Sequence, residues 1–272
     1  MSLYNIQVYD YLGHKQVRIY KRPVAYGEEK AENKIKDSEK ENKKSDAEKQ
    51  EHSKYVSINR TKQSIYEYGY ANRWSMFGTL TFSEQSCDRY DYEEICKKTS
   101  KWLNNQKNSC AKDLVYLYIP EKHPSSGAYH IHILLANTGN LTFVDSGRVS
   151  KNGKAYKRTE NNSDCPTIYN LPQWRYGFTA FTKVQNSDKC VSYISKYITK
   201  ELCEVAKFKR RFFPSHNCKR CEVAKYYWND DDIRDMVMDW YENDLVEHSK
   251  SQKIPEASQI IHYYEIKGEN GL

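Results

Sequence analysis

The chain has 272 residues, 38% of them hydrophobic, and a mean hydropathy of −0.93. This composition predicts a polar, soluble protein with enough apolar residues for one good-sized domain with appendages. No stretch approaches the roughly 18 apolar residues of a membrane span, and the N-terminus lacks the apolar core of a secretion signal. We therefore expect a cytoplasmic protein without a membrane partner.

The formal net charge is +7, and it is unevenly distributed. Residues 229–272 hold four basic and eleven acidic residues, a net charge of −7, so residues 1–228 carry +14. A basic body suits a polyanionic partner, and the 24 tyrosines suit stacking on unpaired bases. The alternative is a basic protein whose tyrosines only pack.

Four segments follow one another along the chain. Residues 1–26 alternate partly around Gly13 and predict an N-terminal β-hairpin. Residues 27–54 are dense in mixed charge and predict a disordered linker or a solvated helix. Residues 55–228 form the main domain, and residues 229–272 predict an acidic helix and strand extension.

Hydrophobic periodicity predicts the elements of the main domain. In chain order they are a helix at 58–72, a strand at 75–82, a helix at 91–107 with Asp91 in its first turn, a hairpin of strands 114–121 and 130–137, a strand at 177–184, and a helix from Ser187 or Asp188 through Lys207. Residues 138–172 show little periodicity and predict a flexible excursion. A helix within 225–246 and a strand at 260–267 follow, so the fold class is α+β with a central antiparallel sheet.

The segment YHIHILLAN, Tyr129 to Asn137, contains two histidines two residues apart. Side chains alternate between the faces of a strand, so His130 and His132 share one face. Pairing Glu121 opposite His130 in the hairpin puts a carboxylate on that face as a third ligand, with His123 in the turn as its competitor. One carboxylate and two imidazoles suit Mn²⁺ or Mg²⁺. The alternative is a pair of packed or surface histidines.

The segment YISKYITKE contains Tyr193 and Tyr197 four residues apart, on one face of a predicted helix. Lys196 and Lys200 each follow a tyrosine by three residues. A phenol with its ordinary pKa of about 10 is a poor nucleophile, and a nearby lysine can stabilise the phenolate or the phosphate that it attacks. The alternative is a tyrosine packed in the core beside solvated lysines.

The order of FGTLTF, an acidic residue, YHIHILLAN and YISKYITKE resembles the HUH-type replication initiators, the Rep endonucleases of rolling-circle plasmids and phages. H-I-H matches the family's His-hydrophobic-His, and Y-x-x-K occurs twice, as in the two-tyrosine type. KRRFFPSHNCK, residues 209–219, is similar to the basic stretch after the family's tyrosine helix. The resemblance covers about residues 55–220.

This resemblance implies a five-stranded antiparallel sheet flanked by helices, similar to an RRM or ferredoxin-like palm. It implies that a tyrosine attacks a phosphate of single-stranded origin DNA, forming a 5′-phosphotyrosine and freeing a 3′-OH, with a second tyrosine for the next transfer. The metal ligands would be His130, His132 and, least securely, Glu121. Lys196 and Lys200 match the family's motif lysine.

The chain differs from helicase-bearing relatives because it has no Walker A motif. GRVSKNGK, residues 147–154, lacks the Ser or Thr that follows the lysine. We therefore expect a host helicase and polymerase as partners, in the cytoplasm of a bacterial host. A transposase or mobilisation relaxase would use the same residues. A non-catalytic single-stranded nucleic-acid-binding module and a metal-dependent hydrolase that uses water are the alternatives from other classes.

Eight cysteines are present, and without a secretion signal we expect reduced thiols. Cys218 and Cys221 make a C-x2-C that could be half of a zinc site, with Cys203 and His216 upstream.

Overall fold

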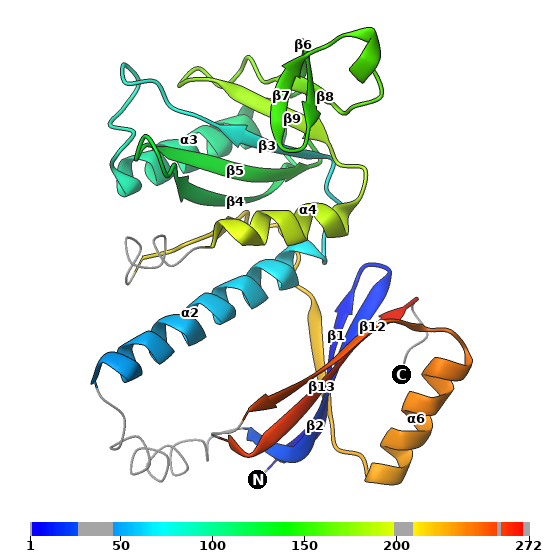
Figure 1. The fold of residues 1–272 in the computed structure, drawn as a ribbon. Helices are drawn as coiled ribbons and strands as arrows, with labels where there is room; N and C mark the ends of the chain where they lie inside the picture. Colours follow the sequence, from blue (N-terminus) through cyan, green and yellow to red (C-terminus); the bar gives the residue numbers. More distant parts are fainter. Residues whose placement is uncertain (1, 27–45, 199–208, 255–256, 269–272) are drawn as a thin grey trace. The chain divides into compact units, whose positions relative to one another are not determined.

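The computed structural model describes residues 2–26, 46–198, 209–254 and 257–268 (Figure 1). The chain divides into two compact units. The terminal unit comprises residues 1–52 and 220–272, and the central unit comprises residues 53–219. Each contains an antiparallel sheet flanked by helices, so the α+β class is confirmed.

The sheet of the terminal unit has the strand order β11-β1-β2-β13-β12. Its elements are β1 (Ser2–Tyr11), β2 (His14–Tyr26), β11 (Glu222–Tyr226), α6 (Asp230–Glu242), β12 (Val246–Ile254) and β13 (Gln259–Lys267). The predicted N-terminal hairpin and late strand are present, whereas β11 and β12 were not predicted. Trp240 of α6 is buried in a cluster with Ile6, Val8 and Val17, which anchors the acidic helix to the sheet.

The central unit contains a sheet of eight strands in the order β10-β4-β5-β3-β9-β8-β6-β7 (Figure 1). Its elements are α2 (Asp46–Gly69), which starts before the division between the units, then β3 (Met76–Leu80), α3 (Tyr92–Ser109), β4 (Val115–Lys122), β5 (Tyr129–Ala136), β6 (Val144–Lys151), β7 (Lys154–Lys157), η1 (Glu160–Asn162), β8 (Thr167–Asn170), β9 (Thr179–Lys183), α4 (Ser187–Ile194), η2 (Ser195–Tyr197) and β10 (Phe213–Pro214).

Helix α3 covers one face of this sheet. Asp91 is its N-cap rather than a first-turn residue, because the carboxylate accepts from the backbone N–H groups of Glu93 and Glu94. The predicted apolar positions of the helix are buried. On β4, the Tyr118 hydroxyl lies 2.8 Å from Ser100 Oγ of α3, which ties the helix to the sheet.

The β4–β5 hairpin has the predicted register. Glu121 pairs with His130, and Ile119 pairs with His132. On its other side β5 pairs with β3, so the two histidines lie on an interior strand of the sheet. This places the H-I-H motif on the best-supported part of the fold.

Two predictions about the sheet were wrong. The resemblance implied five strands, and the structure has eight. Residues 138–172 are not a flexible excursion, because they form β6, β7, η1 and β8. Their turn at Asn152 and Gly153 has φ of 53° and 74°, the conformation that Asn-Gly favours in a tight hairpin. Periodicity missed these strands because they are mostly exposed.

The predicted helix from residue 187 through 207 was also wrong. The helix is capped by Asn186, whose side chain accepts from Lys189 N at 2.8 Å. It ends at Ile194, continues as one 3₁₀ turn, and leaves helical geometry at Ile198, where ψ is 87°. The remainder of the predicted helix, from residue 199, lies outside the described residues.

Helix α2 begins at Asp46, twelve residues before the predicted helix, so the end of the charged segment is helical. Residues 27–45 of that segment lie outside the described residues. None of the described helices is long and apolar enough to cross a membrane. The described cysteines are free thiols, and Cys218 and Cys221 are buried.

Candidate active site

His132 is buried on β5 and has a partner at each ring nitrogen. Its Nε2 lies 2.6 Å from Glu121 Oε2, and its Nδ1 lies 3.2 Å from Thr79 Oγ1 on β3. Glu121 thus contacts His132 rather than its register partner His130. Contacts at both nitrogens hold the imidazole plane in one orientation, and the carboxylate favours a proton on Nε2.

His130 lies two residues earlier on the same face of β5. Its ring centroid is 5.2 Å from that of His123 in the β4–β5 loop. Burial lowers the pKa of His130 below its usual value, and the nearby His123, His132 and Arg89 lower it further. His130 is therefore a neutral imidazole at neutral pH, the form that can accept a proton or bind a cation.

Helix α4 brings the two tyrosines to this face of the sheet. Val191 and Ile194 are fully buried and anchor the helix. At its end, the Ser195 hydroxyl donates to Ser192 O at 2.8 Å and lies 3.1 Å from the Tyr66 hydroxyl of α2. The 3₁₀ turn that follows carries Tyr197.

The ring of Tyr197 stacks on that of His132, with centroids 3.5 Å apart and planes 4° from parallel. Tyr193 meets Tyr197 edge to face at 5.5 Å. Phe77 of β3 completes the group, 5.6 Å from Tyr193 and 6.4 Å from His132. The structure therefore brings both predicted tyrosines to one of the two predicted histidines.

The two phenols differ in environment. Tyr193 is 40% exposed, and the Lys196 Nζ lies 5.4 Å from the centroid of its ring. Tyr197 is partly buried, and burial raises its pKa well above the usual range, reinforced by a hydrogen bond with Tyr193 and by the charge of Glu121. The second predicted lysine, Lys200, lies outside the described residues.

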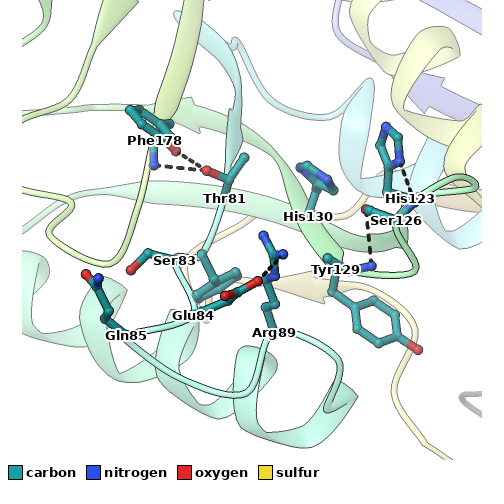
Figure 2. Close-up of a pocket in the computed structure, with 12 residues that line it drawn as sticks. Thr81, Ser83, Glu84, Gln85, Arg89, His123, Ser126, Tyr129, His130 and Phe178 are labelled. Carbon is teal, nitrogen blue, oxygen red and sulfur yellow. Dashed lines mark hydrogen bonds and ion pairs between the residues drawn. The ribbon is translucent and has the colours of Figure 1, made fainter.

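A pocket of about 540 Å³ lies beside His130 (Figure 2). It is lined by the end of β3, the segment that follows it, the β4–β5 loop and the start of β9; its polar and aromatic residues include Thr81, Ser83, Glu84, Gln85, Arg89, His123, Tyr129, His130 and Phe178. The volume lies within the usual range of ligand sites, roughly 300–1,000 Å³.

Comparison with known families bears on this site. Residues 75–202 match the family model described as Replication-associated protein ORF2. The match supports a Rep-type protein of replication initiation. It spans just under half of the chain and includes every predicted site residue, from Glu121 to Lys200. Searches of the curated proteins and of the solved structures gave no significant match.

The predicted metal ligands of this Rep-type protein suit a divalent cation by their chemistry. A carboxylate oxygen and an imidazole nitrogen are already in contact, between Glu121 and His132, and His130 is neutral. Within the described ranges, however, no three such side chains are grouped closely enough to hold a metal ion. That finding includes Cys218 and Cys221, the possible half of a zinc site.

Several residues of the site were not predicted from the sequence. Phe77 forms the aromatic wall behind Tyr193, and Arg89 and Phe178 line the pocket. The parity of Phe77 with Thr79 on one strand was an available signal. The sequence carried no comparable signal for Arg89, which comes from the segment before α3.

Proposed function

We propose that this chain is a rolling-circle replication initiator that nicks and rejoins single-stranded origin DNA. A tyrosine is the nucleophile, a 5′-phosphotyrosine is the intermediate, and Mn²⁺ or Mg²⁺ is the cofactor. The family match supports the replication role. The chemistry rests on the geometry around His132.

One observation carries the proposal: Tyr197 stacks on His132, and Tyr193 meets Tyr197 at 5.5 Å. A structural tyrosine pair would not need an imidazole with both nitrogens engaged by Glu121 and Thr79. Here two phenols and an ordered imidazole–carboxylate pair occupy one face of the sheet. These are the groups that a phosphoryl transfer to tyrosine requires.

The reaction is a transesterification and needs no further reactant. A tyrosine Oη attacks the phosphorus, the new Oη–P bond forms, and the P–O3′ bond breaks. The phenol proton leaves with the attack, and the departing 3′ oxygen takes up a proton. The raised pKa of Tyr197 keeps this phenol protonated at neutral pH, so a base must accept the proton as the attack proceeds.

Glu121, His130 and His132 would hold the cation, which when bound supplies positive charge to the scissile phosphate. His132 orients the ring of Tyr197, and Glu121 fixes the plane of His132. Lys196, beside Tyr193, stabilises the developing negative charge on that phenol or on the phosphate that it attacks. Lys200 is proposed for the same role beside Tyr197.

Two tyrosines on one surface permit two successive transfers. The first tyrosine holds the 5′ end, and the second attacks the next junction while the first ester still exists. Rejoining then releases the first tyrosine. The edge-to-face contact of Tyr193 and Tyr197 places both hydroxyl-bearing rings within reach of a single DNA strand.

The test is adduct formation with end-labelled single-stranded oligonucleotides from the source replicon, in Mn²⁺ or Mg²⁺, on denaturing gels. We expect a protein–DNA band that survives SDS and that is lost when both Tyr193 and Tyr197 are replaced by Phe. Tyr156→Phe, at an exposed tyrosine of β7, is the matched control and should leave the band unchanged.

The other outcomes separate the alternatives. Cleavage without an adduct would indicate a hydrolase that uses water. Binding without cleavage or adduct would indicate a nucleic-acid-binding module. An adduct formed by the double Tyr→Phe variant would exclude these tyrosines as the nucleophiles.

A further inference from the structure

Phe178 is an aromatic side chain held at the rim of the pocket with its ring in solvent. It is 86% exposed, more than any other large hydrophobic residue in the described part of the chain. A single exposed apolar residue is common on protein surfaces and by itself indicates nothing. What distinguishes Phe178 is the rigidity of the backbone that carries it.

That backbone is fastened to β3 and the segment after it. Phe178 N donates to Thr81 Oγ1 at 2.9 Å, and Thr81 Oγ1 donates to Phe178 O at 3.0 Å. Thr81 N donates to the same carbonyl at 2.9 Å. Gly177 permits this approach, because a Cβ there would lie only 2.4 Å from Thr81 O. The ring is therefore presented from a fixed position, with little ordering cost on binding.

The opposite side of the pocket is polar but nearly neutral. The Arg89 guanidinium is paired with the Glu84 carboxylate at 2.6 Å, and Tyr129 N donates to Arg89 O at 2.8 Å, which ties Arg89 to the start of β5. A cation already neutralised by a carboxylate suits an uncharged partner with donors and acceptors better than a phosphate. The Nε of Arg89 is a buried donor for which the described residues offer no acceptor.

We propose that this pocket binds one unpaired nucleobase of single-stranded DNA, stacked on Phe178 with its polar edge toward Arg89 and Glu84. A base has a flat apolar face and a hydrogen-bonding edge, and the pocket offers both kinds of surface. Because His130 lines the same pocket (Figure 2), the base would belong to a nucleotide near the scissile phosphate. The proposal rests on the proposed function for the choice of DNA as substrate.

The test is a cycle between one protein residue and one base. The full-length protein is titrated in EDTA, so that cleavage does not interfere, with a single-stranded oligonucleotide from the source replicon and with variants carrying one abasic site at each position. We expect Phe178→Ala to weaken binding about 5- to 150-fold, the range for loss of one base–aromatic stack. One abasic position should cause a similar loss, and the two losses should not add.

Two variants serve as controls. Phe178→Trp keeps an aromatic face and should bind like the wild type. Tyr55→Ala removes another ring, 59% exposed on α2, and should also leave affinity unchanged. Because Phe178 is exposed, Phe178→Ala should retain the thermal unfolding midpoint of the wild type, which separates lost binding from lost folding.

Two results would overturn the pocket. The first is a Phe178→Ala loss that adds to the loss from every abasic position. The second is a phosphate as occupant: abasic sites would then have no effect, while Glu84→Gln would raise affinity and steepen its salt dependence. Neither depends on cleavage. A non-additive cycle without any adduct would keep the pocket and refute the nicking function, and an adduct with additive cycles would do the reverse.

Discussion

Tyr197 lies flat on His132, with ring centroids 3.5 Å apart. Stacked aromatic pairs contribute roughly 0.5–1.5 kcal/mol beyond the area that they bury. Replacing Tyr197 by Phe keeps this stack and removes only the hydroxyl. Replacing it by Ala would free the imidazole and disturb its contacts with Glu121 and Thr79. Phe substitutions are therefore the informative ones for the tyrosines.

Each single variant, Tyr193→Phe or Tyr197→Phe, should still form some adduct, because the other phenol remains. Rejoining should fall much more than nicking, since the second transfer needs a second tyrosine. The measurement is a strand-transfer assay with two oligonucleotides of different length, in which the recombinant product is counted separately from the nicked one. Equal losses of both products in both variants would contradict alternating use of the tyrosines.

Removing the metal with EDTA should abolish adduct formation, and Mn²⁺ or Mg²⁺ should restore it. Glu121→Gln keeps the shape of the side chain but weakens its contact with His132, so about 10- to 100-fold more metal should be needed. A metal titration of adduct yield measures this. Glu93→Gln is the control, an exposed carboxylate that pairs with Lys209 at 2.6 Å, and its titration should match the wild type.

His130→Ala should lower cleavage about 100-fold or more, the scale expected for losing one group that stabilises a transition state. Affinity for single-stranded DNA should change little, because contacts of Lys and Arg with phosphates dominate binding. Cleavage rates and binding titrations on the same oligonucleotide separate the two effects. A parallel loss of affinity would assign His130 to binding.

Gly69→Ala should destabilise the docking of α4. A Cβ at position 69 would lie 2.4 Å from Val191 Cγ1, and such overpacking costs about 1–3 kcal/mol of unfolding free energy. Because α4 carries the tyrosines, adduct yield should fall as well. Val191→Ala in the same chain should relieve the overlap, whereas Asn59→Ala, at an exposed position of α2, should be neutral. Denaturant unfolding and adduct assays measure both effects.

Stability should decline at alkaline pH because of two buried thiols. Burial raises the pKa of Cys96 and of Cys218 to about 12, from an ordinary value of 9.0. The unfolded chain thus loses these protons first, so their stabilising contribution is complete below pH 9.0 and declines between 9.0 and about 12. Each thiol should contribute about 1.4 kcal/mol per pH unit to that slope.

The measurement is the unfolding free energy as a function of pH for the wild type, Cys96→Ala and Cys218→Ala. Each variant should lose its share of the alkaline slope, whatever its stability at neutral pH. Cys165→Ala, at a partly exposed thiol, is the control and should leave the slope unchanged. A wild-type slope kept by both variants would show that other groups control alkaline unfolding.

The sequence by itself determined the local parts of the site. His130 and His132 share a face because strand side chains alternate, and Glu121 pairs with His130 because a short hairpin sets its own register. Helix α3 followed from apolar periodicity and its Asp91 cap. These features depend on residues that are near one another in the chain, and a pattern can express them.

Only the tertiary structure decided which groups meet. Tyr197 reaches His132 because Val191 and Ile194 seat α4 on the unit's core, and the carboxylate of Glu121 turns to His132 rather than to its register partner. The exposed strands β6 and β7 and the early end of α4 also escaped the pattern. In each case the deciding energy comes from contacts between segments distant in the chain, and local periodicity does not encode these contacts.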